Sequence, residues 1–382
     1  MKKLINICLC LMFLLLSGCH QAEKVLKLKY DNFHVELGNA IVKEPLCYLD
    51  LSELTDDEIN SIKENANMRV EPLPTEIFDN RSNPYEYEAE GTYSCTIKYF
   101  DESVDFKINV VSTQDPIILG PNTIAVKKGD SDFNFDKFYT VKAPYNMQYR
   151  NIDTSQVNFN KAGDYQATVV TTETTGGSGK RKSRNITVKI QDKVIYQLPS
   201  RTILDVPYYN QMENNAPNGC EATSLYMALK YKKKINTDIH SFIGSIPQSY
   251  TPYEGFSGDP FSSPTQMNEY YTIFPQALMT ATYQYAQMRD ISGSDINQII
   301  DEIASDHPVI VWVTGGFHTP NMENYYFGKA PSNLHIVLVN GYDRNKKIFY
   351  MKDPANKELT EVSFEQFQIA FDAMKYAMVV EG

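Results

Sequence analysis

A cysteine precedes an apolar helical face in the stretch Asn218-Gly-Cys-Glu-Ala-Thr-Ser-Leu-Tyr-Met-Ala-Leu229. From Cys220 onward, the apolar residues that recur at helical spacing are Ala222, Leu225, Ala228 and Leu229. A cysteine in the first turn of a helix faces unpaired backbone N–H groups and the positive end of the helix dipole, and both favour the thiolate. We therefore predict that Cys220 is a nucleophile; a buried apolar role is the alternative for a lone cysteine. Glu221 is interpreted as a helix-start charge stabilised by the dipole.

A histidine and an aspartate later in the chain are placed to complete a nucleophilic site. His335 opens the apolar strand Leu334-His-Ile-Val-Leu-Val-Asn-Gly-Tyr-Asp343, and a second strand, Lys347-Ile-Phe-Tyr-Met-Lys352, ends at Asp353. If the two strands form an antiparallel hairpin, His335 and Asp353 come level and can meet across the ladder. The hairpin predicts His335 as the base and Asp353 as the acid that orients it, whereas Asp343 lies at the tip.

In this order, the motifs resemble those of the C39-like cysteine peptidase family. The residues that carry the resemblance are Val206-Pro-Tyr-Tyr-Asn-Gln211, Asn218-Gly-Cys-Glu-Ala-Thr-Ser224, the strand that starts at His335, and Asp353-Pro354. The family has a papain-type core, so the resemblance implies an α+β papain-like cysteine peptidase domain over residues 204–382. It also implies Cys220 as nucleophile, His335 as general base and acid, Asp353 as the group that fixes the imidazole tautomer, and Gln211 as the oxyanion-hole side chain.

The resemblance implies hydrolysis of peptide bonds in a peptide or protein substrate. Leader-processing members of the family are commonly fused to a membrane-spanning exporter; no such segment is recognised here, so leader cleavage is not implied. A cell-wall peptide amidase or transpeptidase is one alternative, and a non-catalytic peptide-binding surface protein is another. Residues 243–278 are rich in Gly, Pro, Ser and Tyr and are predicted to form a long loop or lid beside the site. Paired cysteines and His-x-x-x-His spacing are absent from the sequence, so we expect no metal and no cofactor.

The N-terminus resembles a bacterial lipoprotein signal peptide. Met1-Lys-Lys3 precedes an apolar run that ends in Leu16-Ser-Gly-Cys19, and the run is too short to span a membrane as a helix. The resemblance implies a signal peptide over residues 1–18 and a diacylglycerol group on the sulfur of Cys19. A plain secretory signal or an uncleaved anchor is the alternative. We expect the mature chain on the outer face of the cytoplasmic membrane, anchored by lipid.

Residues 24–192 consist of short runs of β-branched and aromatic residues separated by turn-forming residues, a pattern typical of half-buried strands. A weak internal repeat pairs Val35-Glu-Leu-Gly38 with Val126-Lys-Lys-Gly129, and Gly91-Thr-Tyr93 with Gly163-Asp-Tyr165. The pattern resembles bacterial Ig-like surface modules and predicts two all-β Ig-like sandwiches, over residues 24–113 and 114–192, with a linker at 193–203. Thr55-Asp-Asp-Glu58 predicts a capping box that opens a short helical insertion in the first module. Both modules are interpreted as spacers.

The charge of the chain indicates which partners to expect, and two further cysteines raise the question of a disulfide. The chain has 36 Lys+Arg against 47 Asp+Glu, a net charge of −11, which argues against a nucleic-acid binder. The basic stretch 174–184 predicts a solvated hairpin tip, with contact to an anionic cell-wall polymer as the alternative. Cys47 and Cys95 are expected outside the membrane, where a disulfide between them is chemically allowed; two free thiols are the alternative.

Overall fold

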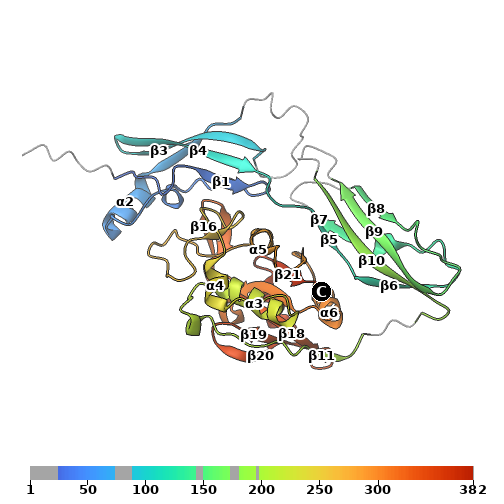
Figure 1. Ribbon diagram of the computed structural model, residues 1–382. Helices are drawn as coiled ribbons and strands as arrows, with labels where there is room; N and C mark the ends of the chain where they lie inside the picture. The colour runs from blue at the N-terminus through green and yellow to red at the C-terminus, as the bar shows by residue number, and fades with distance from the viewer. Residues whose placement is uncertain (1–24, 74–87, 143–148, 173–179, 195–197, 382) are drawn as a thin grey trace, which may run out of the picture.

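The computed structural model of the chain describes residues 25–73, 88–142, 149–172, 180–194 and 198–381 (Figure 1). The expected signal peptide and lipidated Cys19 lie outside these residues. Within the described ranges, no helix combines the length and the apolar character needed to cross a membrane.

The first module is built on a four-stranded sheet of order β1-β4-β3-β2. Its elements are β1 (Phe33–Glu36), η1 (Pro45–Cys47), α2 (Asp56–Asn65), β2 (Asn67–Val70), β3 (Gly91–Tyr99) and β4 (Glu102–Val111). Helix α2 is the predicted insertion. Its capping box is present, because the Thr55 hydroxyl accepts from the Glu58 N–H and the Glu58 carboxylate accepts from the Thr55 N–H.

The second module repeats the topology of the first, with a four-stranded sheet of order β6-β10-β9-β8. Its elements are β5 (Ile117–Leu119), β6 (Thr123–Lys127), η3 (Phe135–Lys137), β7 (Thr140–Lys142), β8 (Tyr149–Asp153), β9 (Gly163–Thr172) and β10 (Arg181–Gln191). In each module the first sheet strand runs parallel to the last, β1 with β4 and β6 with β10. A glycine with positive φ follows that first strand in both copies, Gly38 at +98° and Gly129 at +90°. The predicted internal repeat is confirmed.

The C-terminal domain has mixed α/β content around a seven-stranded antiparallel sheet. The sheet order is β14-β21-β15-β18-β19-β20, and β11 pairs with β18 beside this path. Its strands are β11 (Arg201–Ile203), β14 (Met288–Asp290), β15 (Val309–Thr314), β18 (Leu334–Asp343), β19 (Ile348–Asp353), β20 (Lys357–Ser363) and β21 (Ala377–Val380). Two-stranded pairs lie outside it: β12 (Gln248–Ser249) with β13 (Phe256–Ser257), and β16 (Met322–Tyr325) with β17 (Gly328–Pro331).

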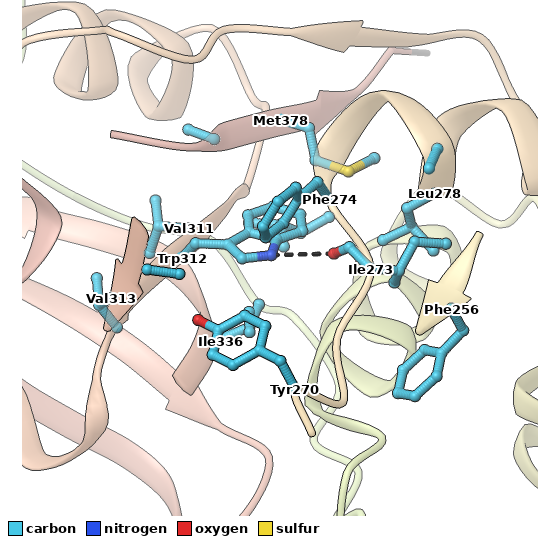
Figure 2. Packing of buried hydrophobic residues seen from close by; sticks show 14 of the residues in the cluster. Phe256, Tyr270, Ile273, Phe274, Leu278, Val311, Trp312, Val313, Ile336 and Met378 are labelled. Atoms are coloured by element: carbon cyan, nitrogen blue, oxygen red, sulfur yellow. Dashed lines mark hydrogen bonds between the residues drawn. The ribbon is translucent and has the colours of Figure 1, made fainter. Parts of the chain in front are cut away.

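Helices and short 3-10 turns complete the C-terminal domain. They are η4 (Met212–Asn214), α3 (Cys220–Tyr231), α4 (Ile239–Gly244), α5 (Pro275–Thr282), α6 (Ile296–Ala304), η5 (Gly315–Phe317) and α7 (Phe364–Phe371). Helix α3 packs on β18, and the Ser224 hydroxyl donates to the Ile336 carbonyl at 3.5 Å. Strand β15 is buried along its whole length, and Trp312 on it is fully buried. The Trp312 indole N–H donates to the Ile273 carbonyl at 3.1 Å (Figure 2).

The first module is not a detached spacer, because its core is continuous with that of the C-terminal domain. The Phe33 ring lies 5.0 Å from Tyr48 within the module and 5.3 Å from Tyr326 on the C-terminal domain. The second module has a core of its own. The described strands of the first module form one sheet and not a two-sheet sandwich. The second module has the two-stranded pair β5–β7 in addition to its four-stranded sheet. The Ig-like type of both modules stays a prediction.

Candidate active site

A cleft of about 270 Å³ in the C-terminal domain brings together three of the four predicted catalytic residues. The three that line it are Cys220, His335 and Gln211. Asp353 does not line the cleft but is hydrogen-bonded to His335, which does. The lining also includes residues of the segment 264–271 and of the β16–β17 hairpin. These residues are Pro264, Met267, Glu269, Tyr270, Tyr271, Glu323 and Tyr325.

Cys220 occupies the first position of α3, as the sequence predicted. The turn before it needs a glycine, since a Cβ on Gly219 would lie 2.8 Å from the Cβ of Ala216. Backbone N–H groups of Ile336 and Glu221 donate to the half-buried sulfur. The nucleophile is therefore held against β18, next to His335.

Glu221 has a different environment from the one expected of a helix-start charge. Its side chain is fully buried, and one carboxylate oxygen accepts from the Thr272 hydroxyl at 2.5 Å and from the Ile273 N–H at 3.2 Å. The other oxygen accepts from the Cys220 thiol at 3.3 Å. Burial raises the pKa of Glu221 above its usual value despite these hydrogen bonds. A buried carboxyl group thus contacts the candidate nucleophile directly.

The protonation state of Cys220 follows from this environment. Burial, and then the neighbouring Glu221, raise the pKa of the Cys220 thiol well above its usual range. The two backbone N–H groups at the sulfur act in the opposite direction but do not outweigh them. Burial and the neighbouring Glu221 therefore oppose the thiolate that the helix start was expected to favour.

His335 and Asp353 meet as predicted. Nε2 of His335 lies 2.7 Å from Oδ1 of Asp353, and their side chains are 14% and 15% exposed. Burial alone would raise the pKa of Asp353, but the hydrogen bond and charge of His335 outweigh it and lower the pKa to about 2. Because Nε2 faces the carboxylate, Nδ1 is the nitrogen left for Cys220; it has no hydrogen-bond partner among the described residues.

The hairpin that joins these two residues is confirmed, with one difference in register. Strands β18 and β19 are antiparallel, and Asp343 pairs with Ile348 at the turn. A bulge lies between Val339 and Gly341, and the regular ladder ends at the pair Leu338–Lys352. His335 and Asp353 are therefore not level; they lie beyond the ladder and reach each other diagonally, which the length of the side chains allows.

Gln211 lines the cleft and is 3% exposed. Its amide nitrogen donates to the Pro217 carbonyl at 2.7 Å, which leaves one N–H of the NH₂ group for another acceptor. Its backbone N–H donates to the Pro354 carbonyl at 2.8 Å, so the residue is tied to the strand end that carries Asp353. Its amide oxygen is buried without a hydrogen-bond partner.

Cys47 and Cys95 are free, buried thiols, so the disulfide considered for them is not formed. The Cys47 thiol donates to the Asn324 carbonyl at 3.3 Å, in the β16–β17 hairpin, and that of Cys95 donates to the Tyr93 carbonyl at 3.8 Å. Burial raises the pKa of each thiol to about 12. Cys47 thus forms a hydrogen bond at the contact between the first module and the C-terminal domain.

The sequence was sufficient to identify the four predicted site residues, but not the residues that surround them. Glu221 was interpreted as a local helix-start charge, and the segment 243–278 was placed beside the site, but no contribution from the β16–β17 hairpin was predicted. The tyrosine pairs Tyr270-Tyr271 and Tyr325-Tyr326 were available as a signal. The predicted lid at 243–278 does border the cleft, and it includes parts of α4 and α5 as well as the pair β12–β13. Several of its side chains, Asn268 among them, are buried.

Comparison with known proteins supports the same class, a papain-like domain of the C39-like type. The model of the Peptidase_C39 like family matches residues 203–379. The uncharacterized protein YvpB of Bacillus subtilis (strain 168) is 32% identical over 184 residues, which cover 43% of this chain and 70% of that protein. The chain belongs to the C39-like peptidase family.

Two solved structures are similar to the C-terminal part of the chain. A crystal structure described as a C39-like peptidase from Bacillus anthracis has a TM-score of 0.41 at 23% identity, covering 48% of this chain and 98% of that one. Xylellain, a cysteine protease from Xylella fastidiosa, has a TM-score of 0.31 at 14% identity, covering 48% of this chain and 87% of that one.

Proposed function

We propose that the chain is a cysteine peptidase that hydrolyses peptide bonds, with Cys220 as nucleophile. The observation that carries this proposal is the convergence of Cys220, His335 and Gln211 on one cleft, with Asp353 hydrogen-bonded to His335 at 2.7 Å. These four residues supply a nucleophile, a base, a group that orients the base, and an oxyanion donor. Membership of the C39-like family supports the same class of chemistry.

The first half of the reaction starts from the neutral thiol. Nδ1 of His335 takes the Cys220 proton as the sulfur bonds to the substrate carbonyl carbon, and Asp353 stabilises the imidazolium that forms. The free N–H of the Gln211 amide and the backbone N–H of Cys220 donate to the oxyanion. His335 then gives its proton to the leaving amine as the C–N bond breaks. The products of this half are the amine and a thioester on Cys220.

The second half repeats these roles with water as the nucleophile. His335 takes a proton from water as the water oxygen bonds to the thioester carbon. The C–S bond breaks, and the proton returns from His335 to the sulfur. A carboxylic acid leaves and the resting thiol is restored, so no cofactor enters the reaction.

We further propose that the protein works outside the cell, anchored to the outer face of the cytoplasmic membrane by diacylglycerol on Cys19. The support is the sequence Leu16-Ser-Gly-Cys19 after an apolar N-terminal run. Metabolic labelling with a radioactive fatty acid tests this proposal, with a Cys19→Ala variant as the control. Label in the wild-type chain and its loss in the variant are expected, whereas equal label in both would contradict the anchor.

The proposed nucleophile is tested by labelling with an epoxysuccinyl-peptide probe of the E-64 type. Cys47 and Cys95 are buried and do not line the cleft, whereas Cys220 is half-buried and lines it, so among the described cysteines Cys220 is the one expected to react. Cys220→Ala should abolish labelling, and His335→Ala should slow it strongly. Labelling of Cys220→Ala at the wild-type rate would contradict the assignment.

A further inference from the structure

Two segments that are distant in sequence contribute to the lining of the cleft beside Cys220 and His335. We call the segment 264–271 and the β16–β17 hairpin together the cleft wall. Met267, Tyr270 and Tyr271 of the first segment face the cleft, as do Glu323 and Tyr325 of the hairpin. The two segments pack on each other, since the Tyr270 and Tyr325 rings lie 4.5 Å apart and the Tyr270 hydroxyl donates to the Pro331 carbonyl.

The C-terminal domain holds the first wall segment from both ends: the Asn218 N–H donates to the Pro260 carbonyl before it, and the Ser257 and Thr272 backbones are hydrogen-bonded to each other just after it. Figure 2 shows the Trp312 indole bonded to the Ile273 carbonyl, just beyond the wall, with Tyr270 beside it. Residues 264–271 belong to no helix or strand, so no regular ladder fixes their backbone. Side-chain contacts therefore contribute much of what fixes their position.

Asn268 provides the main contact, and it reaches the first module. Its side chain is 8% exposed, and its amide nitrogen donates to the carbonyls of Leu46 and Leu49, each at 2.8 Å. The Lys29 ammonium donates to the backbone oxygen of Asn268 at 3.1 Å and to its side-chain oxygen at 3.3 Å. Asn268 lies between Met267 and Glu269, which both line the cleft, but does not line it itself.

Further hydrogen bonds connect the wall to the same part of the first module. The Gln266 side-chain oxygen accepts from the Leu51 N–H at 2.7 Å. In the hairpin, the Asn324 carbonyl accepts from the Cys47 thiol, and the Asn324 amide donates to the Glu44 carboxylate at 3.1 Å. Both wall segments are therefore held by residues 44–51 of a module that contributes no residue to the cleft lining.

We propose that the first module positions the substrate-binding wall of the cleft. Asn268 is the positioning residue, because its hydrogen bonds connect the wall to the first module. The proposal rests on the proposed peptidase function, because it assigns the wall to substrate binding. Cys220 and His335 stand on α3 and β18 and do not depend on these contacts. Loosening the wall should weaken the binding of an extended peptide and leave the intrinsic reactivity of the sulfur unchanged.

The test compares two thiol reagents on the full chain. Iodoacetamide needs no peptide subsite, whereas an epoxysuccinyl-peptide probe must bind along the wall. Asn268→Ala removes the donors to Leu46 and Leu49 and should lower the inactivation rate by the epoxysuccinyl probe at least about tenfold, because two buried carbonyl groups lose their partner. The iodoacetamide rate should stay within about twofold of wild type. Equal rates of epoxysuccinyl inactivation in variant and wild type, or an equal fall with both reagents, would overturn the proposal.

Amide hydrogen exchange supplies a measurement that does not depend on activity. Asn268→Ala should raise exchange in residues 264–271 and 322–331 at least about tenfold and leave α3 unchanged. Unchanged exchange in the wall would overturn the proposal. If the wild-type chain does not react with the epoxysuccinyl probe, the proposed function fails, while the exchange comparison still decides whether the module holds the wall.

Two further variants complete the comparison. Gln266→Ala removes the acceptor of the Leu51 N–H and the donor to the Asp50 carboxylate at the same contact. Because these hydrogen bonds are only partly buried, both measurements should shift in the same direction by a smaller factor; this variant also serves if Asn268→Ala does not fold. His34→Gln is the matched control, because the half-exposed pair between His34 and Glu254 also joins the first module to the C-terminal domain but lies outside the wall. It should leave both measurements at wild-type values, and an effect as large as that of Asn268→Ala would contradict a specific role for the wall.

Discussion

The replacement Glu221→Gln tests how the structure controls the nucleophile. Glutamine can keep the acceptor oxygen that binds the Thr272 hydroxyl and the Ile273 N–H, while it replaces the oxygen next to the Cys220 sulfur by an NH₂ donor. The substitution removes a negative charge that opposes the thiolate and adds a hydrogen bond that favours it. We therefore expect a larger thiolate fraction at neutral pH.

The size of the effect follows from the distance between the two groups. Two unit charges 3.3 Å apart repel by about 5 kcal/mol at an effective dielectric constant of about 20. Relaxation of the surroundings reduces this value, but if only a third remains, the thiolate fraction changes more than about tenfold, since 1.4 kcal/mol corresponds to a factor of about ten. The alkylation rate of Cys220 at pH 7 should rise by at least that factor.

The assay is the second-order rate of iodoacetamide alkylation at Cys220 between pH 5 and 10, followed by mass spectrometry. Glu221→Gln should shift the rise in rate to lower pH relative to wild type. The matched control is Glu269→Gln, which removes a cleft-lining carboxylate with no contact to the sulfur and should change the rate less than about twofold. A profile of Glu221→Gln that superimposes on that of wild type would refute the argument.

Three more outcomes are expected. Asp353→Asn keeps the size of the side chain but removes its charge, so kcat in peptide hydrolysis should fall at least about 100-fold while the fold is retained; a fall below twofold would contradict its role. Gln211→Ala should lower kcat about 10²–10³-fold with little change in iodoacetamide alkylation, because it removes an oxyanion donor and not the base; a parallel loss of alkylation would contradict this. Glu302 is 7% exposed, and although burial alone would raise its pKa, its contacts with His307 and with Arg289 at 2.7 Å lower the pKa from 4.5 to about 2. Its contribution to the free energy of unfolding, about 3 kcal/mol, is then present above about pH 4.5 and lost as the pH falls toward 2. Urea unfolding of wild type and Glu302→Gln should differ by about this amount at pH 7 and converge near pH 2; equal stability at pH 7 would contradict it.

Local patterns in the sequence were sufficient to predict the elements that carry the catalytic residues. Helical spacing after Cys220 predicted α3, and two apolar runs around a short turn predicted the β18–β19 hairpin with His335 and Asp353 at its open end. The bulge near Asn340, which shifts the pairing register of the hairpin by one residue, has no local signal, because a bulge depends on how both strands pack in the sheet.

Long-range contacts could not be predicted in the same way. The Glu221 carboxylate is buried by Thr272, 51 residues away, and helix-start chemistry alone gives no indication of that partner. Asn268 and Leu46 are 222 residues apart, and the alternating pattern of the first module fits a solvent-exposed spacer as well as a docked domain. That Cys47 is a free thiol could not be predicted for the same reason, because its thiol donates to the distant Asn324 carbonyl at the contact between the first module and the C-terminal domain.

Cleavage of an unfolded protein tests the central claim most directly. Reduced and alkylated casein is incubated with the full chain and with Cys220→Ser, and new N-termini are counted by mass spectrometry. We expect new N-termini with the wild-type chain and background levels with Cys220→Ser, which keeps the shape of the site but not its nucleophilicity. Equal numbers of new N-termini from both proteins, or background levels from both, would contradict the claim that Cys220 is the nucleophile of a peptidase.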